Sequence, residues 1–156
     1  MSVFDRRFVV AGLLAMPAGR ASAQGSEFSG ELTASHSLPV IKIVILNASG
    51  VQRQAIALID TGSASCLVEQ SIPKELGLVQ AGSEEALTHD GKRTDPLYSC
   101  QFRFPDGHSF DLQAAARPMQ TAALSFDAII GMSLLRYYDV RIKALERLVT
   151  LRWLGA

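Results

Sequence analysis

One acidic side chain at the end of an apolar run constrains this chain more than any other feature. The apolar residues 57–59 lead directly into Asp60, and Thr61, Gly62 and Ser63 follow it. An ionised carboxylate beside apolar strands is costly unless it accepts hydrogen bonds or shares a proton. The hydroxyls of Thr61 and Ser63 can donate to it, and Gly62 lets the backbone turn sharply. By itself, however, Asp-Thr-Gly is also ordinary turn chemistry at the end of a strand.

The residues around Asp60 belong to a larger and more specific pattern. Small residues and a second apolar stretch follow residues 60–63, and further along the chain Ile129, Ile130 and Gly131 precede a stretch that predicts a short helix over 132–138. The two motifs in this order resemble the active-site segments of the retropepsin-like aspartic proteases, the retroviral and retrotransposon type, in a bacterial-type single-domain form. Two motifs in the same order are more specific than either motif alone.

The resemblance implies a fold and a set of site residues. The fold is an all-β, closed and mostly antiparallel barrel, with one short helix after the Ile-Ile-Gly motif. Asp60 takes the catalytic role, Thr61, Gly62 and Ser63 support the active site, and residues 129–131 form the second motif. The implied activity is aspartic-type endopeptidase activity on a peptide or protein substrate, without a cofactor.

A hairpin between the two motifs is a candidate for the flap that closes over bound peptide in this family. Asp-Gly at 90–91 is a strong signal for a two-residue hairpin turn. The substrate-binding residues implied for the flap are Thr88, His89, Asp90, Gly91 and Lys92. A second hairpin is predicted around residues 105–108, between strands at 99–104 and 109–112, and only the order along the chain favours the first as the flap.

The sequence has one Asp-Thr-Gly, whereas aspartic-protease chemistry needs two carboxyl groups that share a proton. Asp127 is the nearest rival acid but lacks the Thr-Gly that follows Asp60. We therefore expect a homodimer in which each subunit supplies one Asp60. In many relatives the terminal strands of the two chains interleave, and residues 149–153 are the candidate here.

Two other functions remain open. One is a retropepsin-like domain that binds a peptide or a partner but no longer cuts it. The complete motif at residues 60–63 favours the enzyme, because a binding module gains nothing from two facing acids. The other is an unrelated small β-barrel binding protein, which would make both motifs coincidental.

The first 23 residues are typical of an export signal. Arg6 and Arg7 precede an apolar run at residues 8–16, which is too short to span a membrane, and small residues end at Ala23. Both the twin-arginine and the general secretory route remain open. We expect a periplasmic or secreted protein without stable membrane insertion after cleavage, a flexible polar lead-in over 24–37 and one domain over 38–156.

Charge and ligand-type residues exclude some partners. The chain has 15 basic and 15 acidic residues, and export would remove three arginines and one aspartate, leaving 12 basic against 14 acidic. Such a chain offers no electrostatic footprint for nucleic acid. His36, His89 and His108 lack the spacing of metal ligands, so we predict no metal site. Cys66 and Cys100 could form a disulfide in an exported chain or remain buried thiols, and both alternatives stay open.

The remaining pattern predicts regular elements. Residues 38–46 and 52–59 predict a strand pair around a turn at 47–50, and 126–130 predicts a buried strand. Residues 71–77 predict a short surface helix capped by Ser71 and ended by Gly77. Residues 139–142 and 148–153 alternate like strands, with the turn at 143–147.

Overall fold

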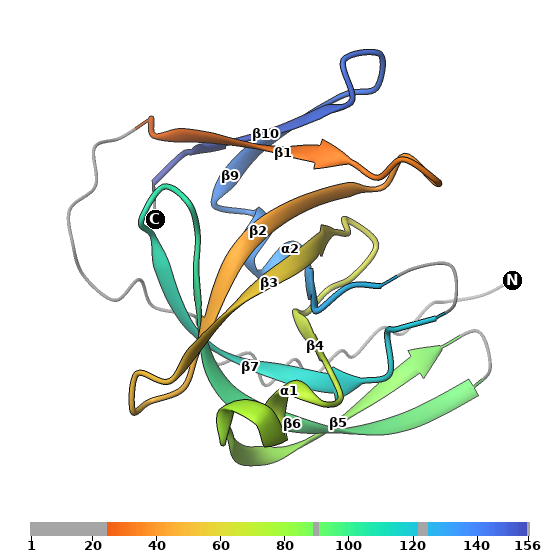
Figure 1. Cartoon of the computed structure of the whole chain (residues 1–156). Helices are drawn as coiled ribbons and strands as arrows, with labels where there is room; N and C mark the ends of the chain where they lie inside the picture. Colours follow the sequence, from red (N-terminus) through yellow and green to blue (C-terminus); the bar gives the residue numbers. More distant parts are fainter. Residues whose placement is uncertain (1–24, 89–90, 122–124, 156) are drawn as a thin grey trace, which may run out of the picture.

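The computed structural model describes residues 25–88, 91–121 and 125–155, which form strands and two short helices (Figure 1). In chain order these elements are β1 (Glu27–Leu32), β2 (Pro39–Leu46), β3 (Gln52–Ile59), β4 (Leu67–Glu69), α1 (Ile72–Leu76), β5 (Val79–Thr88), β6 (Gly91–Arg103), β7 (Ser109–Arg117), β8 (Ala128–Ile130), α2 (Met132–Leu135), β9 (Tyr138–Lys143) and β10 (Leu148–Trp153). The predicted export signal over 1–23 lies outside the described residues. In the described ranges, no helix is long and apolar enough to cross a membrane.

All strands belong to one sheet that curls back on itself. The strand order is β5-β6-β7-β4-β8-β3-β2-β1-β10-β9, and β2 also pairs with β6. That extra pairing joins β6, β7, β4, β8, β3 and β2 into a ring, while β5 extends one side and β1, β10 and β9 extend the other (Figure 1). Among the strands of the described ranges, only β3–β8 and β4–β7 pair in parallel. The prediction of a closed, mostly antiparallel all-β fold is confirmed.

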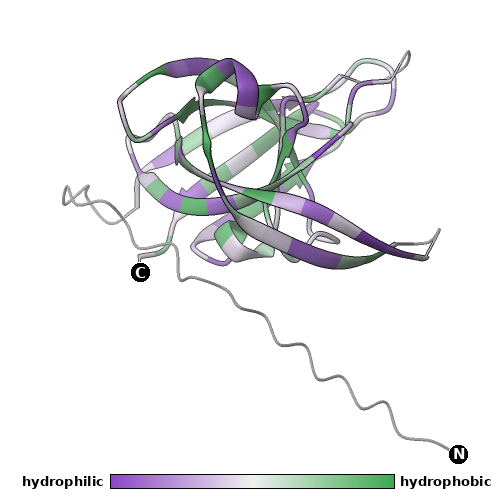
Figure 2. Ribbon diagram, turned by 90° about the horizontal axis from the view of Figure 1, so that it is seen from below, coloured by the Kyte–Doolittle hydropathy of each residue, from purple (hydrophilic) through white to green (hydrophobic). Residues whose placement is uncertain are grey.

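The β2–β3 pair shows why the sequence folds as strands. Ile41, Ile43 and Ile45 are buried, whereas Lys42 between them is exposed, as the two-residue period of a strand requires. Figure 2 shows this alternation of hydropathy along the strands. The turn between β2 and β3 is fixed by Asn47, whose Oδ1 accepts the backbone N–H groups of Ser49 and Val51 at 2.9 Å each. The predicted strand pair is confirmed.

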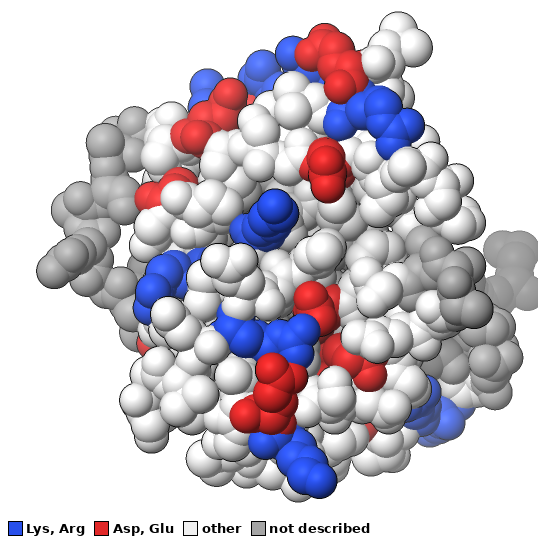
Figure 3. Space-filling view, viewed as in Figure 1, with Lys and Arg blue, Asp and Glu red and all other residues white. Residues whose placement is uncertain are grey.

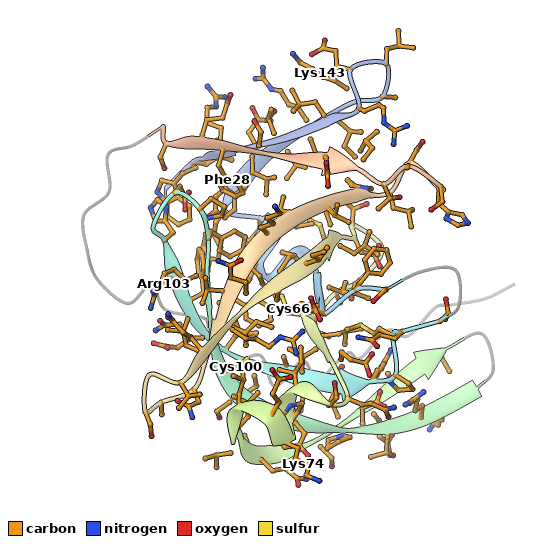
Figure 4. The ribbon with its side chains drawn as sticks, viewed as in Figure 1. Phe28, Cys66, Lys74, Cys100, Arg103 and Lys143 are labelled. Carbon is orange, nitrogen blue, oxygen red and sulfur yellow. The ribbon has the colours of Figure 1, made fainter. Side chains whose placement is uncertain are left out.

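An aromatic cluster fills one end of the barrel. Phe28 and Phe104 lie with ring centroids 5.9 Å apart, and Tyr138 lies 5.3 Å from Phe104 and 5.2 Å from Trp153. His108 stacks on Trp153 at 4.0 Å and its Nδ1 lies 2.8 Å from a carboxylate oxygen of Asp106. This histidine is therefore a core residue. Figure 4 labels Phe28 in this region, and Lys143 at the end of β9 marks the hairpin that extends away from it.

The predicted flexible lead-in over 24–37 is largely wrong, because its centre is a strand of the sheet. β1 lies between β2 and β10, and Phe28 and Leu32 are buried with 8% and 4% of their surface exposed. These two apolar residues lie on one face of the strand. A Cβ atom on Gly30 would lie 2.1 Å from the carbonyl oxygen of Val40, so the Gly permits close approach of β1 to β2. The small and polar composition concealed this strand.

Both helices differ from prediction in detail. α1 is present and Gly77 ends it in the left-handed conformation at φ 60, but Ser71 makes no side-chain cap hydrogen bond. The helix predicted over 132–138 ends at Leu135, because the chain then enters β9 and Tyr138 is buried in the aromatic cluster. Tertiary packing therefore overrides the amphipathic pattern at the end of α2.

The last strand lies in the interior of the sheet. β10 pairs with β1 along one edge and with β9 along the other. Within the described sheet both edges of residues 149–153 are thus occupied by the same chain. As this chain is folded, residues 149–153 therefore have no unpaired backbone edge to offer a second chain, and interleaving with a partner stays a prediction.

Candidate active site

Asp60 lies at the carboxyl ends of two parallel strands. β3 and β8 run side by side with Ile59 opposite Ile130. The Asp60 N–H continues this pairing by donating to the carbonyl oxygen of Ile130 at 3.1 Å. The Asp-Thr-Gly motif and the Ile-Ile-Gly motif are therefore neighbours in the sheet, joined next to Asp60. The buried strand predicted before Gly131 is present as β8, and it positions Asp60 through this hydrogen bond.

The carboxylate of Asp60 is held in a tight turn. Gly62 N–H donates to Asp60 Oδ1 at 2.8 Å, and Ser63 N–H donates to the Asp60 carbonyl oxygen at 3.2 Å. Asp60 is half-buried, whereas Thr61 and Gly62 are exposed. The Ser63 hydroxyl donates instead to the carbonyl oxygen of Ser65 at 2.7 Å. The expectation that Ser63 supplies its hydroxyl to the acid is wrong, since the side chain braces the loop.

Residues 60–65, called the acid loop from here on, are fixed by the start of α2. Met132 N–H donates to the Ser63 carbonyl oxygen at 2.8 Å, and Ser133 N–H donates to that of Ala64 at 3.0 Å. A Cβ atom on Gly131 would lie 2.2 Å from the carbonyl oxygen of Ser65. Only Gly fits between these backbones, because no real Cβ approaches an oxygen so closely. The Ile-Ile-Gly motif is thus the support on which the acid loop rests.

Asp127 has a structural role and does not form a second acid beside Asp60. Its Oδ1 accepts Arg53 Nη2 at 2.6 Å and its Oδ2 accepts the Ile56 N–H at 2.8 Å. Its backbone N–H donates to the Ile56 carbonyl oxygen at 2.8 Å. Both carboxylate oxygens therefore tie β8 to the side of β3.

The two cysteines are free thiols inside the barrel (Figure 4). Cys66 Sγ lies 3.5 Å from Ser133 Oγ. Burial raises the pKa of Cys66 above its ordinary value, and burial raises the pKa of Cys100 to about 12. Of the two alternatives from the sequence, the buried thiols are the observed one.

Comparison with solved structures places this geometry in a known fold. The chain is similar to the crystal structure of a retropepsin-like aspartic protease from Rickettsia conorii, with a TM-score of 0.58, over 85% of this chain and 94% of that chain. This chain has a retropepsin-like fold. The sequence identity is 16%, so the likeness concerns the fold. No family model and no curated protein matches the sequence.

In this retropepsin-like fold the predicted flap is a long hairpin. β5 and β6 pair from Val79–Ser99 to Thr88–Gly91, and Gly91 has φ 114, which suits the turn (Figure 1). His89 and Asp90 lie outside the described residues. Lys92 is exposed on β6 opposite Leu87. The second predicted hairpin is also present, between β6 and β7, and it lies beside the aromatic cluster through Phe104 and His108.

Sequence reasoning missed several polar contacts around the hairpin and the acid loop, one of which joins the two. Ser65 Oγ donates to Glu84 Oε1 at 3.3 Å. Asp95, with 1% of its surface exposed, accepts the Nε atoms of Arg93 and Arg117 at 2.5 Å each. The carboxylate of Glu69 accepts backbone N–H groups after β7. No local pattern marks these residues, because only the pairing of distant strands brings them together.

Charged side chains are otherwise dispersed. On the face seen in Figure 3, basic and acidic groups are interspersed and neither sign forms a continuous area. Across the described ranges, no three His, Cys, Asp or Glu side chains gather closely enough to hold a metal ion.

Proposed function

We propose that this chain is an aspartic-type endopeptidase whose active site forms from two copies of Asp60, one from each subunit of a homodimer. The observation that carries the proposal is the position of Asp60. It lies in a complete Asp-Thr-Gly-Ser loop at the ends of β3 and β8, braced by Gly131, in a retropepsin-like fold.

The chemistry requires a pair of carboxyl groups with one proton between them. The ionised carboxylate takes a proton from the attacking water, while the protonated one donates a hydrogen bond to the scissile carbonyl and later protonates the leaving nitrogen. Gly62 N–H donates to Asp60 Oδ1 at 2.8 Å and leaves Oδ2 for the second acid or the water. No metal or cofactor is part of this mechanism.

A second copy of the chain is the proposed source of the other acid. The sequence has one Asp-Thr-Gly, and both carboxylate oxygens of Asp127 are used within the fold. Thr61 and Gly62 are exposed beside Asp60, which leaves them accessible to the same loop of a partner across a two-fold axis. Thr61 is then the residue that bonds across the axis. Residues 88–92 at the end of the hairpin form the proposed flap over bound peptide.

The proposal places the protein in the periplasm or outside the cell. The support is the sequence of residues 1–23 alone, with Arg6 and Arg7 before a short apolar run and a small-residue exit at Ala23. Detection of a mature chain that begins at Gln24 in the exported fraction tests this part.

Substitution of the acid tests the activity. Asp60→Asn should abolish hydrolysis of an unstructured protein such as casein, because the pair can no longer share a proton, while the thermal midpoint stays within a few degrees of the wild type. Asp111→Asn is the matched control, since Asp111 is an exposed carboxylate on β7 that accepts a hydrogen bond from Gln101.

The outcomes separate the enzyme from the binding domain. Hydrolysis that persists in a folded Asp60→Asn protein would falsify the assignment of Asp60. A wild-type chain that binds peptides but cleaves none would instead support the catalytically inactive retropepsin-like domain.

A further inference from the structure

We propose that Glu84 determines substrate specificity, and that its carboxylate binds a lysine or arginine side chain of the bound peptide. The inference deepens the proposed function and rests on it, because it places a peptide between the acid loop and the β5–β6 hairpin. It adds the chemical class of the substrate, which the acid loop itself does not define.

The position of Glu84 is the first step. Glu84 is half-buried on β5, and its Oε1 accepts the Ser65 hydroxyl at 3.3 Å. Ser65 ends the acid loop that begins with Asp60, and five residues span at most about 17 Å even when fully extended. An extended peptide advances about 3.3 Å per residue. A substrate side chain a few positions from the scissile bond therefore reaches Glu84.

The nearby arginines are bound to a different carboxylate. Asp95 lies directly opposite Glu84 in the β5–β6 pairing, so their side chains share one face of the hairpin. Arg93 and Arg117 both donate their Nε atoms to the buried Asp95. These two contacts offset the charge of Asp95 and hold the arginines there.

Glu84 itself lacks such compensation. Among the described residues, no lysine or arginine nitrogen forms a salt bridge with it within 4.0 Å, and the partner of Oε1 is the neutral hydroxyl of Ser65. A half-buried carboxylate in this state gains most from a charged donor, because charge-assisted hydrogen bonds are roughly twice as strong as neutral ones. The terminal nitrogens of Arg93 and Arg117 would favour an acidic side chain instead, and that preference is the competing outcome of the test.

A binding experiment tests the proposal without requiring cleavage. Two fluorescein-labelled unstructured peptides, identical except for lysine or glutamate on both sides of the centre, are titrated with the Asp60→Asn protein and followed by anisotropy. We expect the lysine peptide to bind at least about tenfold more tightly, as one charge-assisted contact implies. Adding Glu84→Gln, which keeps the shape and removes the charge, should reduce the ratio to about twofold or less.

Glu85→Gln is the matched control. Glu85 is the next residue on β5, is exposed and lies opposite Thr94, so its side chain points away from the face that Glu84 occupies. The Glu85→Gln substitution removes the same charge, and the ratio of the affinities for the lysine and glutamate peptides should stay unchanged. An equal loss in both variants would reduce the preference to net charge and overturn the proposal. Circular dichroism of each variant shows that the fold is retained.

The remaining outcomes also decide the question. Tighter binding of the glutamate peptide, no binding of either peptide, or a ratio that Glu84→Gln leaves unchanged would each overturn the role of Glu84. Failure of the proposed function gives a different result, because the wild-type chain would then cleave neither peptide while Glu84→Gln still abolished the binding preference. If the chain does cut, the cleavage rates of the two peptides should show the same dependence on Glu84.

Discussion

At the scale of single residues, the position of the acid loop is fixed by a close backbone contact at Gly131. Gly131 separates the acid loop from the start of α2, and the carbonyl oxygens of Ser65 and Ser63 lie 2.2 and 2.8 Å from where its Cβ would be. Both neighbours are backbone atoms, which cannot move aside as a flexible side chain does. The position of Asp60 thus depends on a residue that takes no part in the chemistry.

Gly131→Ala should destabilise the fold by about 3 kcal/mol, the upper range for overpacking a filled site, and should reduce peptide hydrolysis more than stability alone explains. Urea unfolding and initial rates measure the two effects. Ser133→Ala is the control, because it removes one weak contact with Cys66 and should cost less than about 1 kcal/mol. A Gly131→Ala protein as stable and active as the wild type would show that the acid loop does not need this close contact.

Because the thiols are buried, the free energy of unfolding should depend on pH in the alkaline range. The pKa of Cys100 is raised from 9.0 to about 12, first because of burial and then because of the nearby Cys66 and Asp111. The unfolded chain loses this proton near pH 9, whereas the folded chain retains it. The thiol's contribution is therefore fully present below pH 9 and is lost between about pH 9 and 12.

Stability to urea should consequently fall by up to about 1.4 kcal/mol per pH unit for Cys100 above pH 9. Cys100→Ala removes this group, so its unfolding free energy should be lower at pH 7 but decline less steeply between pH 9 and 10.5. Cys66 and Tyr138, whose pKa values are also raised, account for the slope that remains. Parallel pH profiles for the two proteins would contradict the burial of a protonated Cys100.

At the scale of elements, β1 connects two parts of the sheet. It pairs with β2 on one side and β10 on the other, and Phe28 contributes to the aromatic cluster. In the hydrogen-bonded order of the sheet, the β9–β10 hairpin is joined to the ring of strands through β1. A segment that the composition marks as a polar leader therefore completes the core.

Removal of residues 1–32 should abolish cooperative unfolding or lower the thermal midpoint by more than 10 °C, since β10 loses one of its two partner strands and two buried side chains are deleted. Removal of residues 1–24 is the control and should leave the midpoint unchanged. Trp153, the single tryptophan, lies in β10 and reports the transition by its fluorescence. Equal midpoints for both truncations would show that β1 adds nothing to the fold.

At the scale of the whole molecule, one chain supplies half of the proposed site. Because the described sheet leaves β10 without a free edge, we expect the subunits to meet through the region around the exposed Thr61 and Gly62 rather than by interleaved terminal strands. A contact confined to that region is small, and small interfaces are generally weak.

Specific activity should therefore fall when the protein is diluted, in proportion to the dimer fraction measured by sedimentation. Mixing the wild type with excess Asp60→Asn chains should reduce activity further, because mixed dimers carry one functional acid. An Asp111→Asn chain in the same excess is the control and should not inhibit. A monomer that retains full activity at nanomolar concentration would refute the shared site.

The sequence by itself determined the features that depend on local chemistry. Three such features are the turn at residues 60–63, the Gly131 that follows β8, and the left-handed Gly77. They follow from what short backbone segments require sterically and in hydrogen bonding. The β2–β3 pair followed from apolar residues alternating on strands that flank a turn. Resemblance of the two motifs to one family then supplied the all-β barrel.

Only the tertiary structure decided which distant residues meet. Asp127 is bonded to Arg53 and Ile56 because β3 and β8 are parallel neighbours, and Glu84 reaches Ser65 because the β5 register places it there. The strand character of β1 was also decided at this level, since its two buried residues gain their contacts from β2 and β10. Alternation along a strand tells which face is buried, but the free energy of burial depends on the partner strand, which local sequence does not specify.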